Sequence, residues 1–279
     1  MIGHLPLRRR LIDRLMLGIV ILLTVLALLP LGFILIYVVI RALPALNLGF
    51  FTQTPEPLGM AGGGMLNAIV GTLLLVGMAS LMAIPVSILT GIYLSEHGSG
   101  RFANIVRLLT NTMAGVPSIA AGLFAYTLVV LAMGGFSAFS GSVALAILMM
   151  PVMVRATEEG LRMVPRELRE GALALGIPQW KATIRVILPT ALSPIVTGIL
   201  LSVARASGEA APLLFTAFGS PFLTFDPTHP IAALPLQIFV YATAPYKVSK
   251  DLAWTGALTL VVIVLITSLL ARLLATRHR

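Results

Sequence analysis

The chain has 279 residues, of which 58% are hydrophobic and 10% are charged, and its formal net charge is +9. This composition excludes an ordinary soluble globular domain and indicates several membrane spans. The absence of cysteine from the sequence excludes a disulfide framework, a thiolate metal site and a cysteine nucleophile. Because the basic residues stand beside apolar runs, the positive charge indicates membrane orientation and not nucleic-acid binding.

Six apolar runs are long enough, or nearly so, to cross a hydrocarbon core of about 30 Å at about 1.5 Å per residue. The first follows an arginine cluster and is too long for a signal-peptide core, so we interpret it as an uncleaved span. In the third, Pro117 predicts a kink. The fourth is the weakest, because Arg155 closes it after about 15 residues. The predicted spans are about 15–40, 66–94, 112–133, 141–155, 191–215 and 252–275.

The positive charges predict how these spans are oriented. Fifteen of the nineteen Lys and Arg residues lie on one side of the predicted topology, and only Arg41, Lys247 and Lys250 lie on the other. Short positively charged segments stay in the cytoplasm. We therefore expect both termini to be cytoplasmic and the whole chain, 1–279, to form one transmembrane domain. The segments expected in the cytoplasm are 1–14, 95–111, 155–190 and 272–279, whereas 41–65 and 216–250 are expected outside with short helical pieces.

The segment 155–190 is the one long polar stretch of the sequence. Pro165 can open a helix, because the first helical turn does not need its missing N–H. Gly176 suits the left-handed residue that follows a helix end. Pro178 opens a second short helix, and Pro189 is expected to block its continuation into the next apolar run. These signals predict a helix–turn–helix outside the bilayer, although a charge run alone is equally compatible with a plain solvated loop.

This segment resembles the EAA loop of ABC-importer permeases. The pattern is E-A-A, three residues, G, nine residues, I, any residue, and L-P, and the spacing agrees at every step. Gly171 replaces the first Ala and Val186 replaces Ile, and both changes are small. The resemblance implies a loop that docks into a groove on a separate ATPase subunit and passes its motion to the membrane helices. The residues expected to couple to the ATPase are Glu170, Gly171, Ala172, Gly176, Leu188 and Pro189.

The fifth apolar run carries two charges, Arg205 and Glu209. A charge deep in the bilayer costs about 2.5–3.5 kcal/mol, so such residues usually face protein or water and are paired. Residues four apart on a helix can meet, and both charges share the side of a small-residue row, so we expect them to pair and to point into the bundle. They form either a structural ion pair or an anion path in which the guanidinium of Arg205 attracts an oxyanion. The small-residue row is Gly198, Ser202, Ala206 and Ala210.

Five further stretches resemble the PstA-type permeases of phosphate-specific ABC importers, over roughly residues 60–260. The resemblance implies an all-α type I importer (MetI-like) fold with six transmembrane helices. It also implies a PstC-type permease as heterodimer partner, two copies of an ABC ATPase, and an external phosphate-binding protein. ATP and Mg²⁺ would bind the ATPase, and no cofactor is expected in this chain. The stretches are GGGMLNAIVGTLLL, IPVSILTGIYLSEHGSG, GVPSIAAGLFAY, ARASGEAAPLLFTA and PIAALPLQIF.

Other functions lack sequence support. No lysine follows a glycine as in a Walker A motif, no HExxH or GxSxG occurs, and the four histidines are scattered. The leading hypothesis is therefore the permease subunit of a phosphate importer in the bacterial inner membrane. A permease for sulfate, molybdate or phosphonate is the nearest alternative. A stand-alone channel or a proton-coupled carrier using Arg205 and Glu209 is a further alternative, but neither needs the 155–190 loop.

Overall fold

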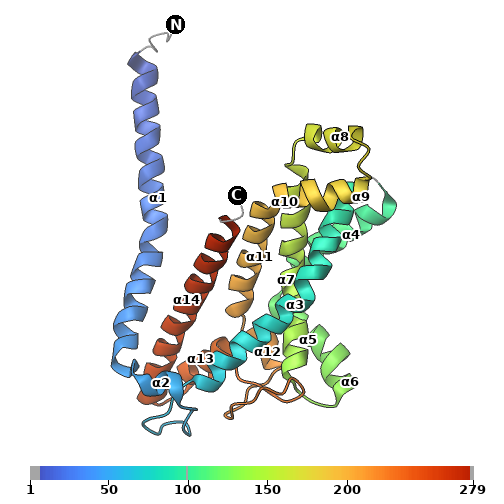
Figure 1. The fold of residues 1–279 in the computed structure, drawn as a ribbon. Coiled ribbons are helices and arrows are strands. Elements are labelled where there is room, and N and C mark those ends of the chain that lie inside the picture. Colours follow the sequence, from blue (N-terminus) through green and yellow to red (C-terminus); the bar gives the residue numbers. More distant parts are fainter. Residues whose placement is uncertain (1–6, 99, 277–279) are drawn as a thin grey trace.

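The computed structural model describes residues 7–98 and 100–276, and the regular elements in these ranges are helical (Figure 1). The long helices are α1 (Leu7–Ala42), α3 (Leu66–Glu96), α4 (Arg101–Ala114), α7 (Ala138–Arg162), α11 (Leu192–Ser207) and α14 (Lys247–Thr276). The shorter elements are η1 (Leu43–Ala45), α2 (Leu48–Thr52), α5 (Ser118–Ala125), η2 (Tyr126–Val130), α6 (Leu131–Met133), α8 (Arg166–Ala174), α9 (Gln179–Ala182), η3 (Thr183–Ile187), α10 (Leu188–Thr190), α12 (Ala211–Leu214) and α13 (Leu234–Thr243).

Within the described ranges, four helices are long and apolar enough to cross a membrane: α1, α3, α7 and α14. Two further crossings arise when bent helix pairs are each counted as one span. The first pair is α4 with the α5–α6 segment, bent by 111°, and the second is Gln179–Thr190 with α11, bent by 69°. The predicted all-α membrane protein with six spans agrees with this arrangement. The predicted spans 15–40, 66–94 and 252–275 lie inside α1, α3 and α14.

The predicted fourth span, 141–155, lies inside a helix that is longer at both ends. Helix α7 starts earlier, at Ala138, and continues to Arg162, seven residues past Arg155. Arg155 does not end the helix, because its guanidinium reaches across to α4 and donates to Asn111 Oδ1 from Nε and Nη2, at 2.9 and 2.6 Å. The predicted loop 155–190 is correspondingly shorter than expected, because its first eight residues belong to α7.

The predicted third and fifth spans are each interrupted. In place of a helix over 112–133, α4 ends at Ala114 and the chain turns before Ser118 starts α5. Proline disfavours the helical region for the residue before it, so Pro117 produces a full break where a kink was expected. In place of a helix over 191–215, α11 ends at Ser207 and the short α12 follows from Ala211.

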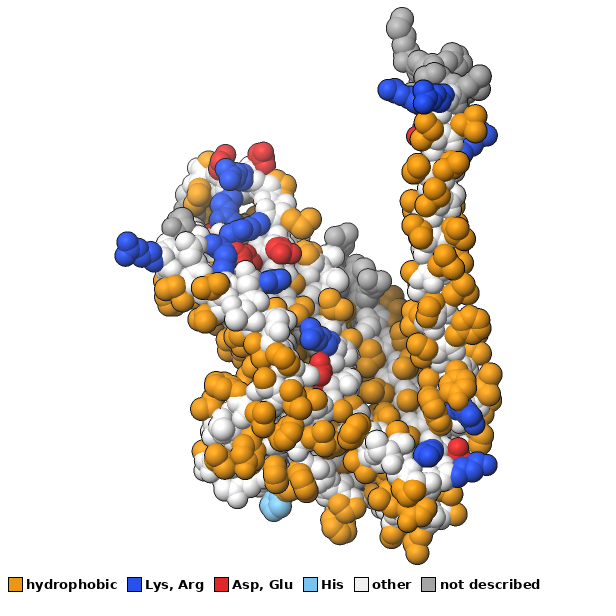
Figure 2. Space-filling model, turned by 180° about the vertical axis from the view of Figure 1, so that it is seen from behind, with side chains coloured by type: hydrophobic (Ala, Val, Ile, Leu, Met, Phe, Trp, Pro, Cys, Tyr) orange, Lys and Arg blue, Asp and Glu red, His pale blue; other side chains and the backbone are white. Residues whose placement is uncertain are grey.

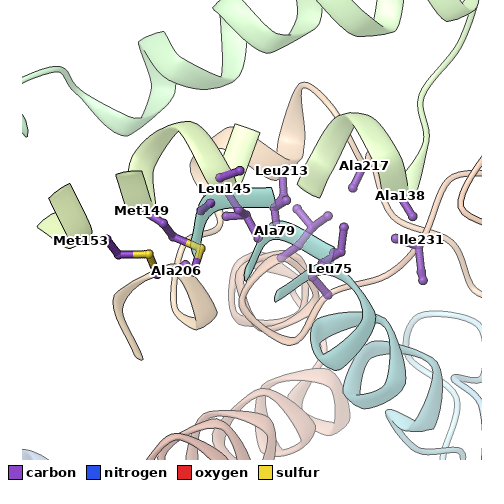
Figure 3. Close-up of a cluster of buried hydrophobic side chains, with 14 residues drawn as sticks. Leu75, Ala79, Ala138, Leu145, Met149, Met153, Ala206, Leu213, Ala217 and Ile231 are labelled. Carbon is purple, nitrogen blue, oxygen red and sulfur yellow. The ribbon is translucent and has the colours of Figure 1, made fainter. Parts of the chain in front are cut away.

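The main core lies between α3, α7 and the end of α11, together with the segment that precedes α13 (Figure 3). Leu75 and Ala79 of α3 pack with Leu145 and Met149 of α7 in this cluster. Ala206, the neighbour of Arg205, belongs to the same cluster and is buried. The core therefore connects α3 directly to the part of α11 that carries the predicted charge site.

Helix α1 stands apart from this core along most of its length (Figure 1). It meets α14 only near its end, where the rings of Tyr37 and Trp254 lie 5.2 Å apart and Thr255 Oγ1 donates to the Ala42 carbonyl at 2.9 Å. The first part of α1, from Leu11 onward, exposes its apolar side chains on all sides. The start of α1 and the end of α14 lie toward the end of the molecule that carries α8 (Figure 1).

Candidate functional site

The polar segment folds as the predicted helix–turn–helix. Helix α8 starts directly after Pro165, and α9 starts directly after Pro178. Gly176 between them has φ of +75°, as predicted for the residue after a helix end. The N–H of Gly176 donates to the Leu173 carbonyl at 2.9 Å, and the N–H of Ile177 donates to the Ala172 carbonyl at 3.2 Å. This bond pair is the Schellman arrangement, in which a left-handed residue satisfies the last helical carbonyls.

The expected interruption between the second short helix and the next apolar run is present, but it lies at Ala191 and not at Pro189. The helical path from Gln179 runs through Pro189 to Thr190, and the turn comes at Ala191. A π-helical turn, η3, precedes the proline. Because proline has no N–H to donate, a segment that already departs from regular α-helical bonding accommodates it without a break.

We call residues 163–190 the coupling loop, and most of its predicted functional residues are exposed. Glu170, Gly171 and Gly176 are exposed, as is Pro189, whereas Ala172 is buried and Leu188 is half-buried. The second half of the loop is anchored by a small apolar cluster that joins α7 to α11. Several large apolar side chains of the loop nevertheless face outward. They are Leu168, Leu173, Leu175, Trp180 and Ile184.

Charged side chains gather around the end of the molecule that carries the coupling loop, whereas apolar side chains cover the middle (Figure 2). Two buried carboxylates organise this end, and the sequence analysis did not identify either. Glu96, the last residue of α3, accepts from Arg169 and Gln179 of the loop. Glu158 of α7 pairs with Arg107 at 2.7 Å and with Arg162 at 2.9 Å. An acidic residue at the cytoplasmic end of a predicted span is the signal that could have found Glu96.

Arg205 and Glu209 form the predicted ion pair, with Arg205 Nε 3.6 Å from Glu209 Oε1. The pair forms across the end of α11, where Gly208 keeps a right-handed conformation and lets the chain continue through one more turn. The expectation that both charges point into this chain's own bundle is wrong for Arg205. Its side chain is 55% exposed, whereas that of Glu209 is 19% exposed. The guanidinium therefore lies on a face of α11 that this chain leaves open.

The same face of α11 continues toward the coupling loop at intervals of four residues, through Leu201, Thr197 and Ser193, which are all exposed. These three residues help to line a cavity of about 620 Å³ between α7 and α11. Arg155 and Glu159 of α7 line its other side. The open face of α11 thus carries the Arg205 guanidinium at one end and the hydroxyl groups of Thr197 and Ser193 farther along, while a guanidinium and a carboxylate face this second part from α7.

The predicted small-residue row brings α11 close to α7. Gly198, Ser202 and Ala206 are buried. A Cβ added at Gly198 would lie 2.1 Å from the Cβ of Ala156, so only glycine fits there. Close approach of this kind is typical of membrane helices that pack through small residues. It fixes the rotation of α11 and therefore the direction in which Arg205 faces.

A bundle of apolar helices with a polar helix–turn–helix at one end places the chain, by class, among helical membrane proteins. Residues 83–279 match the family described as binding-protein-dependent transport system inner membrane component, and the chain belongs to that family. It is therefore a transport subunit of the inner membrane and not an enzyme.

The relatives and structures are consistent with this assignment. The chain is 46% identical over 242 residues, 86% of its length and 84% of the relative, to the phosphate transport system permease protein PstA of Xylella fastidiosa strain Temecula1. It is 42% identical over 263 residues to the PstA protein of Haemophilus influenzae, covering 94% of this chain and 93% of that one. A chain of the MetNI methionine ABC transporter in an inward-facing conformation shares its fold, with a TM-score of 0.65 at 16% identity, covering 77% of this chain and 97% of that chain. The predicted MetI-like permease fold is thus confirmed.

Proposed function

We propose that this chain is the membrane permease subunit of an ATP-driven, binding-protein-dependent importer of inorganic phosphate. The observation that carries the proposal is Arg205, a guanidinium held on the open face of a membrane helix by its pair with Glu209. The relatives that the chain matches over most of its length carry the name of phosphate transport permeases, and phosphate is one of the oxyanions that a planar fork of donors fits.

The proposed anion path follows the open face of α11. Arg205 lies about 20 Å along the helix from Leu192 at 1.5 Å per residue, so it stands well within an apolar core of about 30 Å. A charge at that depth needs water, a partner chain or a passing anion around it. A second permease seated on this face, of the PstC type, would enclose the path between the two chains. Glu209 would hold the guanidinium in place or accept a proton from a protonated phosphate oxygen.

The coupling loop supports the ATP-driven part of the proposal. It exposes several large apolar side chains, of which Leu175 and Trp180 are the most exposed among those named above, and exposed apolar groups of this kind mark a docking surface. We assign this surface to an ABC ATPase present in two copies per transporter, which would bind ATP and Mg²⁺. Glu170, Gly171, Ala172, Gly176, Leu188 and Pro189 are the residues of this chain proposed to couple to it. The external phosphate-binding protein would deliver its ligand at the opposite end, beside α2 and α13.

Reconstitution of the complete transporter tests this proposal. The chain would be co-expressed with a second permease and an ATPase, placed in vesicles, and supplied with the phosphate-loaded binding protein. We expect uptake of labelled phosphate that needs enclosed ATP and is unaffected by excess sulfate, molybdate or phosphonate. Preferential uptake of one of those anions would contradict the substrate assignment. Uptake by this chain without an ATPase would instead indicate a channel or carrier.

A further inference from the structure

Glu96 is a buried carboxylate at the junction between the membrane helices and the coupling loop. It is the last residue of α3, and its side chain is only 4% exposed. Arg169 of α8 donates from Nη1 to Glu96 Oε2 at 2.5 Å, and the side-chain amide of Gln179 in α9 donates to the same oxygen at 3.2 Å. One carboxylate therefore holds both helices of the coupling loop to the end of one membrane helix.

This contact is the one ion pair that α8 forms among the described residues, and α8 otherwise packs against η3 and α9 of its own loop. Of the α8 side chains, only Ala172 is buried, and Arg169 is the one charged group of α8 with an ion pair among the described residues. A buried carboxylate that loses its cation is left without compensation, so the attachment is retained whenever the loop is in place. A displacement of α8 would therefore act on α3 through Arg169 and Glu96.

Helix α3 also contacts the end of α11 that carries Arg205, although the larger contact of α11 is with α7. Ala79 and Ala83 of α3 lie in the same buried cluster as Ala206, which is adjacent to Arg205. Gly91, farther along α3, packs so closely on α7 that a Cβ there would lie 2.5 Å from the Cβ of Thr157. Densely packed helices transmit a displacement because they cannot deform continuously. A physical connection therefore runs from the coupling loop through Glu96 and α3 to Arg205.

The ion pair between Glu96 and Arg169 lies beside a cavity. Glu96 lines a cavity of about 600 Å³ together with Arg162, Arg166 and Arg169. Its second oxygen, Oε1, is buried and has no hydrogen-bond partner among the residues that the structure describes. The contact between α3 and α8 thus rests on a single oxygen of a buried carboxylate beside a cavity.

We propose that Glu96 is a positioning residue for energy coupling, which ties the coupling loop to α3 so that ATPase motion reaches the anion path. The proposal rests on the proposed function, since it requires an ATPase at the loop. Glu158 supplies a matched comparison. It is a similarly buried carboxylate with two arginine partners at the same end of the protein, yet neither partner belongs to the coupling loop.

The experiment compares Glu96→Gln, Arg169→Gln and Glu158→Gln in the reconstituted transporter with its ATPase, second permease and binding protein. Three quantities are measured: the amount of assembled complex, the rate of ATP hydrolysis, and the number of phosphate ions taken up per ATP. We expect Glu96→Gln and Arg169→Gln to assemble and to hydrolyse ATP, but to lose about tenfold in phosphate taken up per ATP, because the loop no longer moves α3. Glu158→Gln should keep the wild-type ratio.

The exchanged pair, Glu96→Arg with Arg169→Glu, tests whether the ion pair itself is required or whether any change at these positions disrupts the protein. We expect this double variant to recover most of the phosphate uptake per ATP that the single variants lose. A wild-type ratio in Glu96→Gln would overturn the proposal, and so would an equal loss in Glu158→Gln or no recovery in the exchanged pair. If Glu96→Gln does not assemble, the same measurements on Arg169→Gln test the proposal, because this variant changes the more exposed partner of the ion pair. A wild-type uptake per ATP in Arg169→Gln would then overturn the proposal. A failure of the proposed function can be distinguished from a failure of the proposal for Glu96, because in the first case the wild-type transporter itself would take up no phosphate.

Discussion

At the scale of single residues, Arg205 shows what helix geometry can and cannot predict. The four-residue spacing correctly predicts the pair with Glu209, although the helix ends between them. The same geometry predicts the wrong surroundings for Arg205, because a helical wheel gives a direction and not the identity of what lies there. The small-residue row packs against α7, whereas Arg205 lies to one side of it, on a face that this chain leaves exposed.

Because Arg205 is exposed, substitutions at this position can be compared for phosphate uptake without disturbing the packed core. Arg205→Lys keeps the charge but loses the planar fork, so we expect phosphate uptake per assembled transporter to fall by about tenfold or more. The double variant Arg205→Met with Glu209→Gln removes both charges, and we expect it to assemble but not to transport. Uptake of labelled phosphate in vesicles, normalised to the amount of complex, measures both. Full uptake by the double variant would show a purely structural pair and remove Arg205 from the anion path.

Glu96 illustrates the limit of sequence reasoning at this scale. Local signals predict the left-handed Gly176 correctly, because a turn conformation depends on the residue itself and its neighbours. The pairing of Glu96 with Arg169 joins residues 73 positions apart, and no local pattern contains it. The motif that resembles the EAA loop selects Glu170, whereas the buried carboxylate that holds the loop lies outside the motif, on the membrane helix.

At the scale of elements, the coupling loop was predictable because prolines and a glycine mark both its helices. We predict that Gly176→Val disrupts it, because a β-branched residue at φ of +75° is strained, by about 1–2 kcal/mol. The expected result is a normally inserted chain with reduced phosphate uptake and reduced ATP hydrolysis. Gly171→Ala is the matched control, since no atom would lie within 4 Å of its new Cβ and it restores the residue of the family pattern. Wild-type transport by Gly176→Val would contradict the role of the turn.

The packing of α11 on α7 gives a second prediction for an element. Gly198→Ala places a Cβ 2.1 Å from that of Ala156, so α11 must shift or rotate. Overpacking of this kind costs about 1–3 kcal/mol, and we expect a lower midpoint of thermal unfolding in detergent. Gly77→Ala serves as the control, because a Cβ at that position of α3 meets no atom within 4 Å. An unchanged midpoint for Gly198→Ala would show that α11 does not pack as closely as described.

At the scale of the whole molecule, the distribution of charge and the arrangement of the helices agree. The chain end that starts α1, the end of α14 and the coupling loop lie toward one end of the molecule (Figure 1). The spans that lie in α1, α3 and α14 were predictable from apolar length, because backbone groups in lipid must be satisfied within helices, whereas the breaks in the predicted third and fifth spans were not. The separation of α1 from the core could not be predicted from the sequence. An apolar helix face has the same sequence pattern whether lipid or another chain covers it.

The membrane orientation of the chain follows from where its basic residues lie. Fifteen of the nineteen Lys and Arg residues fall in segments expected in the cytoplasm, a bias that retains such segments there. Because the chain has no cysteine, single cysteines report sidedness without background. Asp13→Cys and Leu175→Cys are exposed positions that should resist an impermeant thiol reagent added to intact cells, and should react once the membrane is opened. Thr54→Cys and Phe225→Cys, exposed at the opposite end, should react at once. Labelling of Leu175→Cys from outside would reverse the orientation and place the coupling loop where no ATP-hydrolysing partner could reach it.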